Sequence, residues 1–476
     1  MEISVFALPV LLAGLFISSS DKILLAFLIC FVFGGTATLS LSALGGAPIL
    51  PAVLFLPFVA WRALKEKSLM NGRISQLSYP NAGFWLMLLV IYEVFSAYVF
   101  PRLFEGETLV YMANRGAFGG VKLLPLKPAS TNLTQSFYSI LGLITYVATS
   151  QLLNSSARLI AFRNSLLIIV LLDILAALIQ FGESYLGLPP VLAEVRNANY
   201  AMFANYEEGG LMRIQGTFPE TSAFSAFTLP LFAFSFSLFR CNAVPAYSGS
   251  LALLLLSILL LSTSTTTYFS LGIYLVCFMF ILLGEAFSFS AQLRMGKLAA
   301  ITWLLLVLIC IALLVSPEIV TAVVNFFDLT LFHKLESSSG KERGAWITQG
   351  LINLSDTNGF GVGFGSNRCS NFFIALISSI GFLGAGLFAV FLWKIAVSQT
   401  EGLSTPESQV INAAKHALLI SLFSLFASAP FAEPGMMFYV FAAVSAAGFN
   451  LNLCKTSPNE SSATWNYDSK SGRIMT

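Results

Sequence analysis

The sequence has few charged residues and almost no histidine. Asp, Glu, Lys and Arg together make up 10% of the 476 residues, and His333 and His416 are the only histidines. Two isolated histidines exclude a metal site built from histidine ligands, which needs several of them together. The formal net charge is +2, and no basic tract of five or more residues occurs. This composition argues against a nucleic-acid partner.

Paired cysteines are also lacking. The six cysteines are scattered, and none forms a CxxC pair. Most lie in or beside apolar segments, where cysteine behaves as a small packing residue, so we expect neither disulfides nor metal ligands from them. They are Cys30, Cys241, Cys277, Cys310, Cys369 and Cys454.

What the sequence has in abundance is apolar side chains. Hydrophobic residues make up 57% of the chain, and the mean hydropathy is +0.81. A water-facing surface needs far more charge than this, and apolar runs of about 18 or more residues recur along the chain. The sequence therefore predicts an all-α, polytopic integral membrane protein.

The apolar runs predict about thirteen transmembrane helices, and twelve or fourteen remain open because the third run is short and two runs lie close together. The expected spans are 3–20, 22–43, 47–61, 83–100, 134–153, 165–186, 222–239, 250–264, 266–284, 298–316, 371–394, 416–431 and 435–453. We expect a single transmembrane domain over 1–454, followed by a cytoplasmic tail over 455–476.

The orientation follows from the positions of lysine and arginine, which favour the cytoplasmic side. Short basic connections at 62–82, 154–164 and 285–297 mark that side, as does the basic tail. The opposite side then holds three long loops with most of the acidic residues. These expected outer loops are 101–133, 187–221 and 317–370.

Glu93 and Asp173 are the clear ionisable residues inside the expected spans. A carboxylate inside a membrane is costly, which makes it a candidate functional group. A position near a helix end or a local hydrogen bond explains each of them equally well.

The loop before the span at 222–239 reads LMRIQGTFPETSAF and carries a first candidate site. Arg213 offers a planar fork of donors that matches phosphate oxygens. Gly216 lets the backbone turn closely around a ligand. Glu220 stands at the mouth of the next helix, where it is a candidate general base. The alternative is that Glu220 is simply a helix cap.

A second polar segment, at 337–371, combines Arg343 and Trp346 with a glycine run that includes Gly361 and Gly363, and then Arg368. The glycine run resembles a phosphate cradle. Nucleotide binding is nevertheless unsupported, because no strand precedes the run and no GK[ST] follows it. The alternative is a mobile loop that needs glycine in order to turn.

Together the two loops predict an anion site on one face of the membrane. Arg196, Arg213, Arg343 and Arg368 form a candidate receptor for a lipid-linked pyrophosphate. Glu433, in the FAEPGM segment between the last two spans, is expected to place a carboxylate on the same face.

Several motifs resemble the bacterial O-antigen and exopolysaccharide polymerases (Wzy-type), members of the O-antigen ligase/polymerase superfamily. GTFPETSAF is similar to the GTFPEPS-type signature of that family, with Thr221 where a proline is expected. STSTTTYFSLGI at 262–273 and the segment from Arg343 through GFGVGFGSNRCSNFF to 384 also resemble it. The resemblance covers roughly 200–390, and its strength lies in the joint order of loose motifs.

The resemblance implies a GT-C-like membrane fold with two large functional outer loops. It also implies an enzyme of the bacterial inner membrane that joins undecaprenyl-pyrophosphate-linked oligosaccharide repeat units into a surface polysaccharide. A flippase and a chain-length regulator are the expected protein partners. We expect a metal-independent glycosyltransferase without a cofactor, in which Glu220, Arg213 and Arg343 are catalytic. The expected substrate-binding residues are Arg196, Gly216, Trp346, Gly361, Gly363, Arg368 and Glu433.

Two other functions stay open. O-antigen ligases share the architecture but carry a histidine just before the span after the second loop, where this chain has Ser370 and Asn371. A flippase or other transporter is the second alternative. Transporters place their binding groups near the bilayer midplane, whereas this chain concentrates polar groups in outer loops.

Overall fold

The structure is a computed structural model. It describes residues 2–41, 47–66, 75–114, 120–198, 207–208, 211–241, 247–287, 338–398 and 403–448. The expected span 298–316 therefore lies outside the described residues, as do Cys310, His333, Cys454 and the tail 455–476. The described cysteines, Cys30, Cys241, Cys277 and Cys369, are all free thiols.

Most of the described chain is helical, as expected for a membrane protein of this class. Five helices are long and apolar enough to cross a membrane: α5 (Ala82–Leu103), α7 (Ser156–Tyr185), α9 (Thr221–Arg240), α16 (Phe372–Ala396) and α17 (Thr405–Ser428). The other helices are α1 (Ala7–Phe16), α2 (Ser20–Val32), α3 (Pro51–Leu64), α6 (Ser130–Leu152), α8 (Val191–Val195), α10 (Tyr247–Leu261), α11 (Thr265–Phe287), α15 (Ser338–Asp356) and α18 (Met436–Ser445), with a 3-10 turn at Ser75–Leu77.

Every expected span within the described residues coincides with a helix, but several helices are shorter than expected. The span expected at 22–43 ends as helix α2 at Val32. Its last turn docks on the GTFPET loop, because Thr217 donates a hydrogen bond to the Val32 carbonyl and accepts one from the Gly35 amide. A side chain at Gly35 would collide with the Thr217 carbonyl oxygen, at 2.6 Å. Gly35 therefore allows the loop to pack closely against the end of the helix.

Short strands interrupt the helical architecture, which the expectation of an all-α chain missed. The strands β1 (Glu2–Ile3), β2 (Leu39–Leu41) and β3 (Ala47–Ile49) form one antiparallel sheet. Hairpins join β4 (Leu109–Asn114) to β5 (Gly120–Pro125) and β6 (Glu207–Glu208) to β7 (Leu211–Met212). The hydropathy pattern missed them because each is only two to six residues long.

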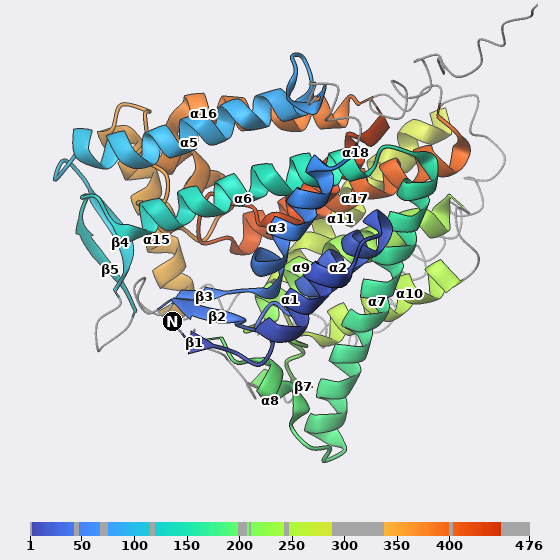
Figure 1. The fold of residues 1–476 in the computed structure, drawn as a ribbon. Helices are drawn as coiled ribbons and strands as arrows, with labels where there is room; N and C mark the ends of the chain where they lie inside the picture. Colours follow the sequence, from blue (N-terminus) through green and yellow to red (C-terminus); the bar gives the residue numbers. More distant parts are fainter. Residues whose placement is uncertain are drawn as a thin grey trace, which may run out of the picture.

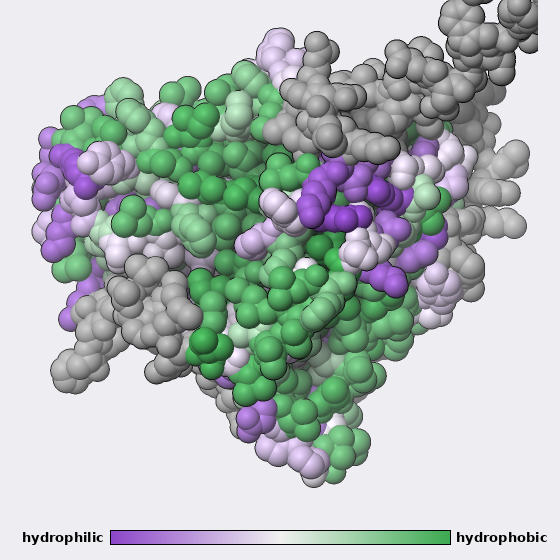
Figure 2. Space-filling model, viewed as in Figure 1, coloured by the Kyte–Doolittle hydropathy of each residue, from purple (hydrophilic) through white to green (hydrophobic). Residues whose placement is uncertain are grey.

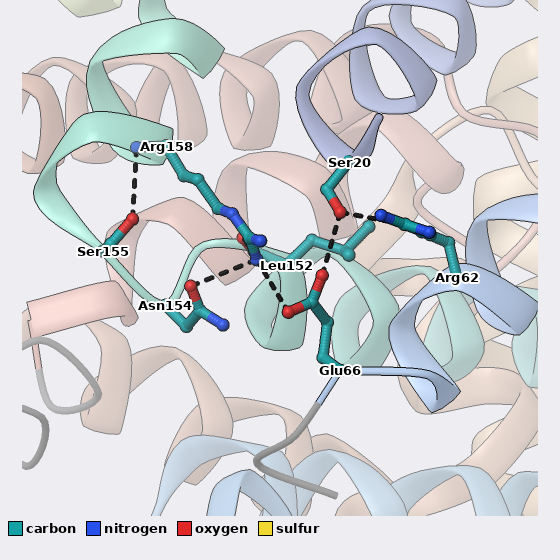
Figure 3. Close-up of polar contacts among 7 residues, drawn as sticks. All are labelled: Ser20, Arg62, Glu66, Leu152, Asn154, Ser155 and Arg158. Carbon is teal, nitrogen blue, oxygen red and sulfur yellow. Dashed lines mark hydrogen bonds and ion pairs between the residues drawn. The ribbon is translucent and has the colours of Figure 1, made fainter. Parts of the chain in front are cut away.

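The helices place the expected outer loops together. Figure 1 shows β4, β5, α15, α8 and β7 along the left and lower sides of the molecule, while α6 passes to α7 on the opposite side. The two basic connections 62–82 and 154–164 also meet, since Arg158 forms an ion pair with Glu66 (Figure 3). This grouping of loops is what the charge pattern predicts, while the side that faces outward stays a prediction.

Helix α9 lies at the centre of the helical body, packed most extensively against α17 and also against α10 and α11. Its aromatic residues Phe224 and Phe234 are fully buried. Figure 2 shows a broad apolar surface, with hydrophilic residues gathered at the left edge, in a patch right of the centre and near the lower end. This central helix begins directly after Glu220, so the fold connects the first outer loop to the core.

Candidate functional site

Helix α15 carries the polar residues of the second outer segment and is held in place at several points. Gln349 donates a hydrogen bond of 2.8 Å to the Leu109 carbonyl in β4, and Thr108 donates one of 2.6 Å to Asp356. At the other end, Ser370 donates to the Arg343 carbonyl at 3.2 Å. The helix is therefore fixed between the β4–β5 hairpin and the start of α16.

The residues just before α16 are fixed through their backbone. The Arg368 amide donates to the Tyr111 carbonyl, and the Cys369 amide donates to the Pro430 carbonyl, both at 3.0 Å. Asn371 then caps the helix by accepting bonds from the amides of Phe373 and Ile374. Ser370 and Asn371 stand where the resemblance places a histidine in ligases, and here Asn371 caps the helix N-terminus.

The guanidinium of Arg368 lies between two aromatic rings from different parts of the chain. Its Cζ is 5.3 Å from the centroid of Trp346 on α15 and 5.8 Å from that of Phe431, which follows α17. Such cation–π contacts stabilise a cation by about 0.5–2 kcal/mol, more when it is shielded from water. The rings orient Arg368 without neutralising its charge.

Charged groups from both outer loops surround Arg368. Partial burial lowers the pKa of its guanidinium, the attraction of Glu220 opposes this, and Arg343 and Glu342 act with opposite signs. Glu220 belongs to the first loop, whereas Arg343 and Arg368 belong to the second. The structure thus brings together four of the predicted site residues: Glu220, Arg343, Trp346 and Arg368.

Glu220 precedes α9, but its side chain does not cap the helix. Its backbone is extended and its carboxylate makes no hydrogen bond to the first-turn amides. The carboxylate instead accepts a hydrogen bond from Ser222. Because this hydroxyl is its hydrogen-bond donor among the described residues, the simple capping explanation does not account for Glu220.

Arg196 and Gly216 contact each other within the first loop, and their predicted role in substrate binding stays a prediction. Arg196 donates from Nε at 2.7 Å, and also from Nη2, to the Gly216 carbonyl. Burial lowers the pKa of Arg196, while nearby Glu183 counteracts the shift. Gly216 has φ +53°, and its amide donates to Gln180 Oε1 at 2.8 Å. These hydrogen bonds hold the backbone conformation of the first loop.

Arg213 lies at the start of the same loop. Its carbonyl accepts a hydrogen bond of 3.0 Å from Gln180 Nε2 on α7. Gln180 thus holds the backbone on both sides of Ile214, because its Oε1 also accepts the Gln215 amide. The structure fixes the backbone of Arg213, and its predicted role toward a pyrophosphate stays a prediction.

Gly361 and Gly363 pack against the kinked part of α16 near Gly381. The Gly361 amide donates to Thr357 Oγ1 at 3.0 Å, and the Gly363 amide donates to the Ser379 carbonyl at 2.8 Å. The carbonyl is available because α16 is kinked at Gly381, where φ is +64°. A side chain at Gly361 would lie 2.7 Å from the Ser379 backbone. Both amides predicted to cradle phosphate are therefore already bound to protein.

Glu433 lies two residues beyond Phe431, in the segment between α17 and α18. Its Oε1 accepts a hydrogen bond of 2.9 Å from the Gly435 amide. Burial raises the pKa of this carboxyl to about 7, although the Gly435 amide favours the charged form. Glu433 also interacts electrostatically with Glu93 on α5, whose carboxylate accepts a hydrogen bond from Ser139.

Sequence reasoning missed Phe431 and Ser222, although each lies two residues from a predicted carboxylate. Phe431 follows a proline in the same short segment as Glu433, and this proximity was an available signal. Among the described residues, no three His, Cys, Asp or Glu side chains gather as a metal site would require, and we assign no metal ligand.

The central cluster has the composition of an anion-binding site with an adjacent base. Two guanidinium groups can hold an oxyanion, and an aromatic ring can pack against a sugar or lipid group. The Glu220 carboxylate can accept a proton. No family model matches the chain, and no curated protein is significantly similar to it. The function is therefore argued from this geometry and from the motifs.

Proposed function

We propose that the chain is a GT-C-like, metal-independent glycosyltransferase of the bacterial inner membrane. It polymerises undecaprenyl-pyrophosphate-linked oligosaccharide repeat units into a surface polysaccharide on the outer face of that membrane. A flippase supplies the lipid-linked units, and a chain-length regulator acts on the growing polymer. These partners follow from the resemblance of the motifs.

One observation carries the proposal: Arg368 lies within electrostatic range of Glu220, Arg343 and Glu342 and between two aromatic rings. Two arginines of the second loop and one carboxylate of the first loop therefore share a site at the ends of membrane helices. A lipid-linked pyrophosphate needs such a site, because its charged group lies at the membrane surface while its tail stays in the bilayer.

The proposed reaction needs a base that takes the proton of the acceptor hydroxyl. It also needs positive charge beside the pyrophosphate that leaves the donor sugar. A hydroxyl oxygen of the acceptor attacks the anomeric carbon of the donor sugar, and the bond from that carbon to the pyrophosphate oxygen breaks. The electron pair leaves with the lipid pyrophosphate, where Arg343 and Arg368 stabilise it. The hydroxyl proton passes to Glu220.

The test is to analyse lipid-linked intermediates in cells that lack this protein. We expect single repeat units on undecaprenyl pyrophosphate to accumulate, because their assembly and export continue while their joining fails. Long polymers that remain attached to the lipid would instead identify a ligase. Normal polysaccharide in the deletion strain would overturn the proposal.

Complementation links this phenotype to the site. Arg368→Lys keeps the charge but loses the planar fork, so it should leave single units unjoined while the protein accumulates normally. The matched control is Arg102→Lys, since the exposed Arg102 donates to a carbonyl of its own helix, that of Tyr98, and packs on the Tyr98 ring. Equal activity of the two variants would remove Arg368 from the site.

A further inference from the structure

Phe431, which no sequence motif indicated, lies in the segment between α17 and α18. Its neighbours Ala429 and Ala432 are buried in the hydrophobic core of the helical body. Phe431 is only half-buried and, among the described residues, is not part of that core or packed against it. The guanidinium of Arg368 lies over its ring, with Cζ 5.8 Å from the ring centroid. Core packing therefore does not account for this aromatic side chain.

The residues around Arg368 are joined by hydrogen bonds that fix the neighbouring aromatic groups. The Cys369 amide donates to the Pro430 carbonyl at 3.0 Å, which holds the segment between α17 and α18. The Cys369 thiol donates to the Trp346 carbonyl at 3.6 Å. The Arg368 amide donates to the Tyr111 carbonyl at 3.0 Å, and the Tyr111 ring packs against Trp346 with centroids 6.2 Å apart. The backbone thus places aromatic rings from two segments beside one arginine.

The side chain of Arg368 has no hydrogen-bond acceptor in the part of the chain that the structure describes. Its Nε is buried without a partner, and no described carboxylate forms an ion pair with it. The indole Nε1 of Trp346 is also buried without an acceptor. Buried donors without a partner are rare in folded proteins, because each has lost its hydrogen bonds to water. Two such donors on contacting groups indicate an acceptor that a ligand supplies.

A ring beside Arg368 affects how strongly this arginine binds an anion. A long arginine side chain samples many rotamers, and holding it in one of them costs conformational entropy. A ligand that has to order the side chain binds more weakly by that cost. A ring that attracts the guanidinium restricts it before the ligand arrives. An aliphatic side chain fills similar space but lacks the π face that attracts the cation.

We propose that Phe431 is a positioning residue, whose ring holds the Arg368 guanidinium in the orientation that receives the lipid-linked pyrophosphate. This inference rests on the proposed function, because it adds a residue to the same site for the same anion. Phe431 acts through Arg368, so loss of the ring weakens the site only while Arg368 is present.

The first measurement is the dissociation constant of inorganic pyrophosphate for the purified full-length protein, by isothermal titration calorimetry in metal-free buffer. Phe431→Leu keeps an apolar side chain but removes the ring. Binding should therefore weaken about threefold to tenfold, which corresponds to the cost of ordering one long side chain. Phe431→Tyr keeps the ring face and should restore most of the affinity. Wild-type affinity in Phe431→Leu, or no binding of pyrophosphate by the wild-type protein, would refute the inference.

Phe426→Leu is the matched control for loss of an aromatic ring. Phe426 lies near the end of α17 and is 40% exposed, and its ring packs against those of Phe269 and Phe373. This variant should bind pyrophosphate as the wild-type protein does. A loss equal to that of Phe431→Leu would show that the effect is not specific to the ring beside Arg368. The Tm of each variant checks its folding, and Phe431→Met takes the place of Phe431→Leu if the latter is unstable.

A double-mutant cycle with Arg368→Lys separates positioning from a merely structural role. Lysine has no planar fork for the ring to orient, so adding Phe431→Leu should weaken binding by less than about twofold more. The same loss in both backgrounds would contradict the inference, because Phe431 would then act independently of Arg368. The proposed function fails by a different result. Normal polysaccharide in the deletion strain, together with Phe431-dependent binding of pyrophosphate, would reject the polymerase and retain the positioned anion site.

Discussion

The two polar clusters at opposite ends of the helical body differ in how their charged side chains are paired. In the cluster between α2, α3 and α7, Arg158 pairs with Glu66 at 3.0 Å, and Glu66 also accepts a hydrogen bond of 2.8 Å from Ser20 (Figure 3). Arg62 donates to Ser20 in turn. In the outer cluster, Arg368 is oriented by aromatic rings and forms no ion pair closer than 4 Å with the described carboxylates.

The two clusters therefore differ in how closely their charges are paired within the protein. The Arg158–Glu66 cluster satisfies its charges within the protein, and the pKa of Glu66 is lowered because hydrogen bonds from Arg158 and Ser20 outweigh the effect of burial. In the outer cluster, Glu220 and Glu342 attract Arg368 and Arg343 repels it, but all three act at a distance and not through an ion pair. The charged groups of this cluster are therefore less closely paired than Arg158 and Glu66.

The largest effect should come from Glu220→Gln. The amide preserves the shape of the side chain and its bond from Ser222 but does not accept a proton. We expect the polymerisation rate to fall about 10²–10⁴-fold, with donor binding unchanged. The measurement is single-turnover transfer by purified protein, together with binding of a non-transferable donor analogue. Near-normal transfer would leave Glu433 as the next carboxylate to test.

Arg343→Lys should have the next largest effect. Arg343 is exposed on α15, so its side chain contributes little to packing and the variant should fold normally. Loss of the planar fork should lower transfer by roughly tenfold to a hundredfold. Lys341→Arg, two residues earlier on the same exposed helix, is the matched control and should be neutral. Undiminished transfer by Arg343→Lys would show that only the charge at this position matters, and an equal loss in both variants would show that the loss is not specific to Arg343.

The positions of the helices could be predicted from the sequence, and so could the two polar segments, because both depend on local composition. The roles of individual arginines could not. Arg196 binds the Gly216 carbonyl and Arg368 lies against Phe431, and these partners are 20 and 63 residues away. No local pattern distinguishes an arginine that binds a carbonyl from one that faces a ligand.

The glycine run is a second case in which local sequence does not identify the distant contacts of a residue. A run of glycines predicts close backbone approach, and that inference was correct for Gly361 and Gly363. The segments that approach them were not predictable: the broken backbone of α16 lies against Gly361, and Ser96 and Pro101 of α5 lie against Gly363. The kink at Gly381 depends on contacts between α16 and the glycine run, and a hydropathy profile contains no such information.

A smaller effect, on stability alone, should follow from Arg158→Ala. The side chains of Arg158 and Glu66 are 25% and 14% exposed, so the lost ion pair should cost about 1–3 kcal/mol in the free energy of unfolding. Transfer per folded molecule should be unchanged, because this cluster lies at the far end of the helices. The measurement is denaturant unfolding paired with activity normalised to folded protein. Arg163→Ala, on the same helix, is the control, since Arg163 donates hydrogen bonds to the neighbouring Asn164.

A pH dependence of stability should originate at Glu433. Burial raises the pKa of this carboxyl from 4.5 in the unfolded chain to about 7 in the folded protein. The folded state therefore holds a proton that the unfolded state releases between these values. This contribution to stability is fully present below pH 4.5 and is lost as the pH rises to about 7.

The measurement is the Tm between pH 4.5 and pH 8, compared with that of Glu433→Gln. The amide remains neutral throughout, so this variant should show a flatter decline than the wild-type protein. Glu93, Tyr138 and Tyr439 interact electrostatically with Glu433, and the substitution removes its charge from all three. Glu66→Gln serves as the contrast. Because the pKa of Glu66 is lowered, its stabilising contribution disappears below pH 4.5 and should leave the slope above that pH unchanged. Parallel slopes in wild type and Glu433→Gln would place the titrating group elsewhere in the protein.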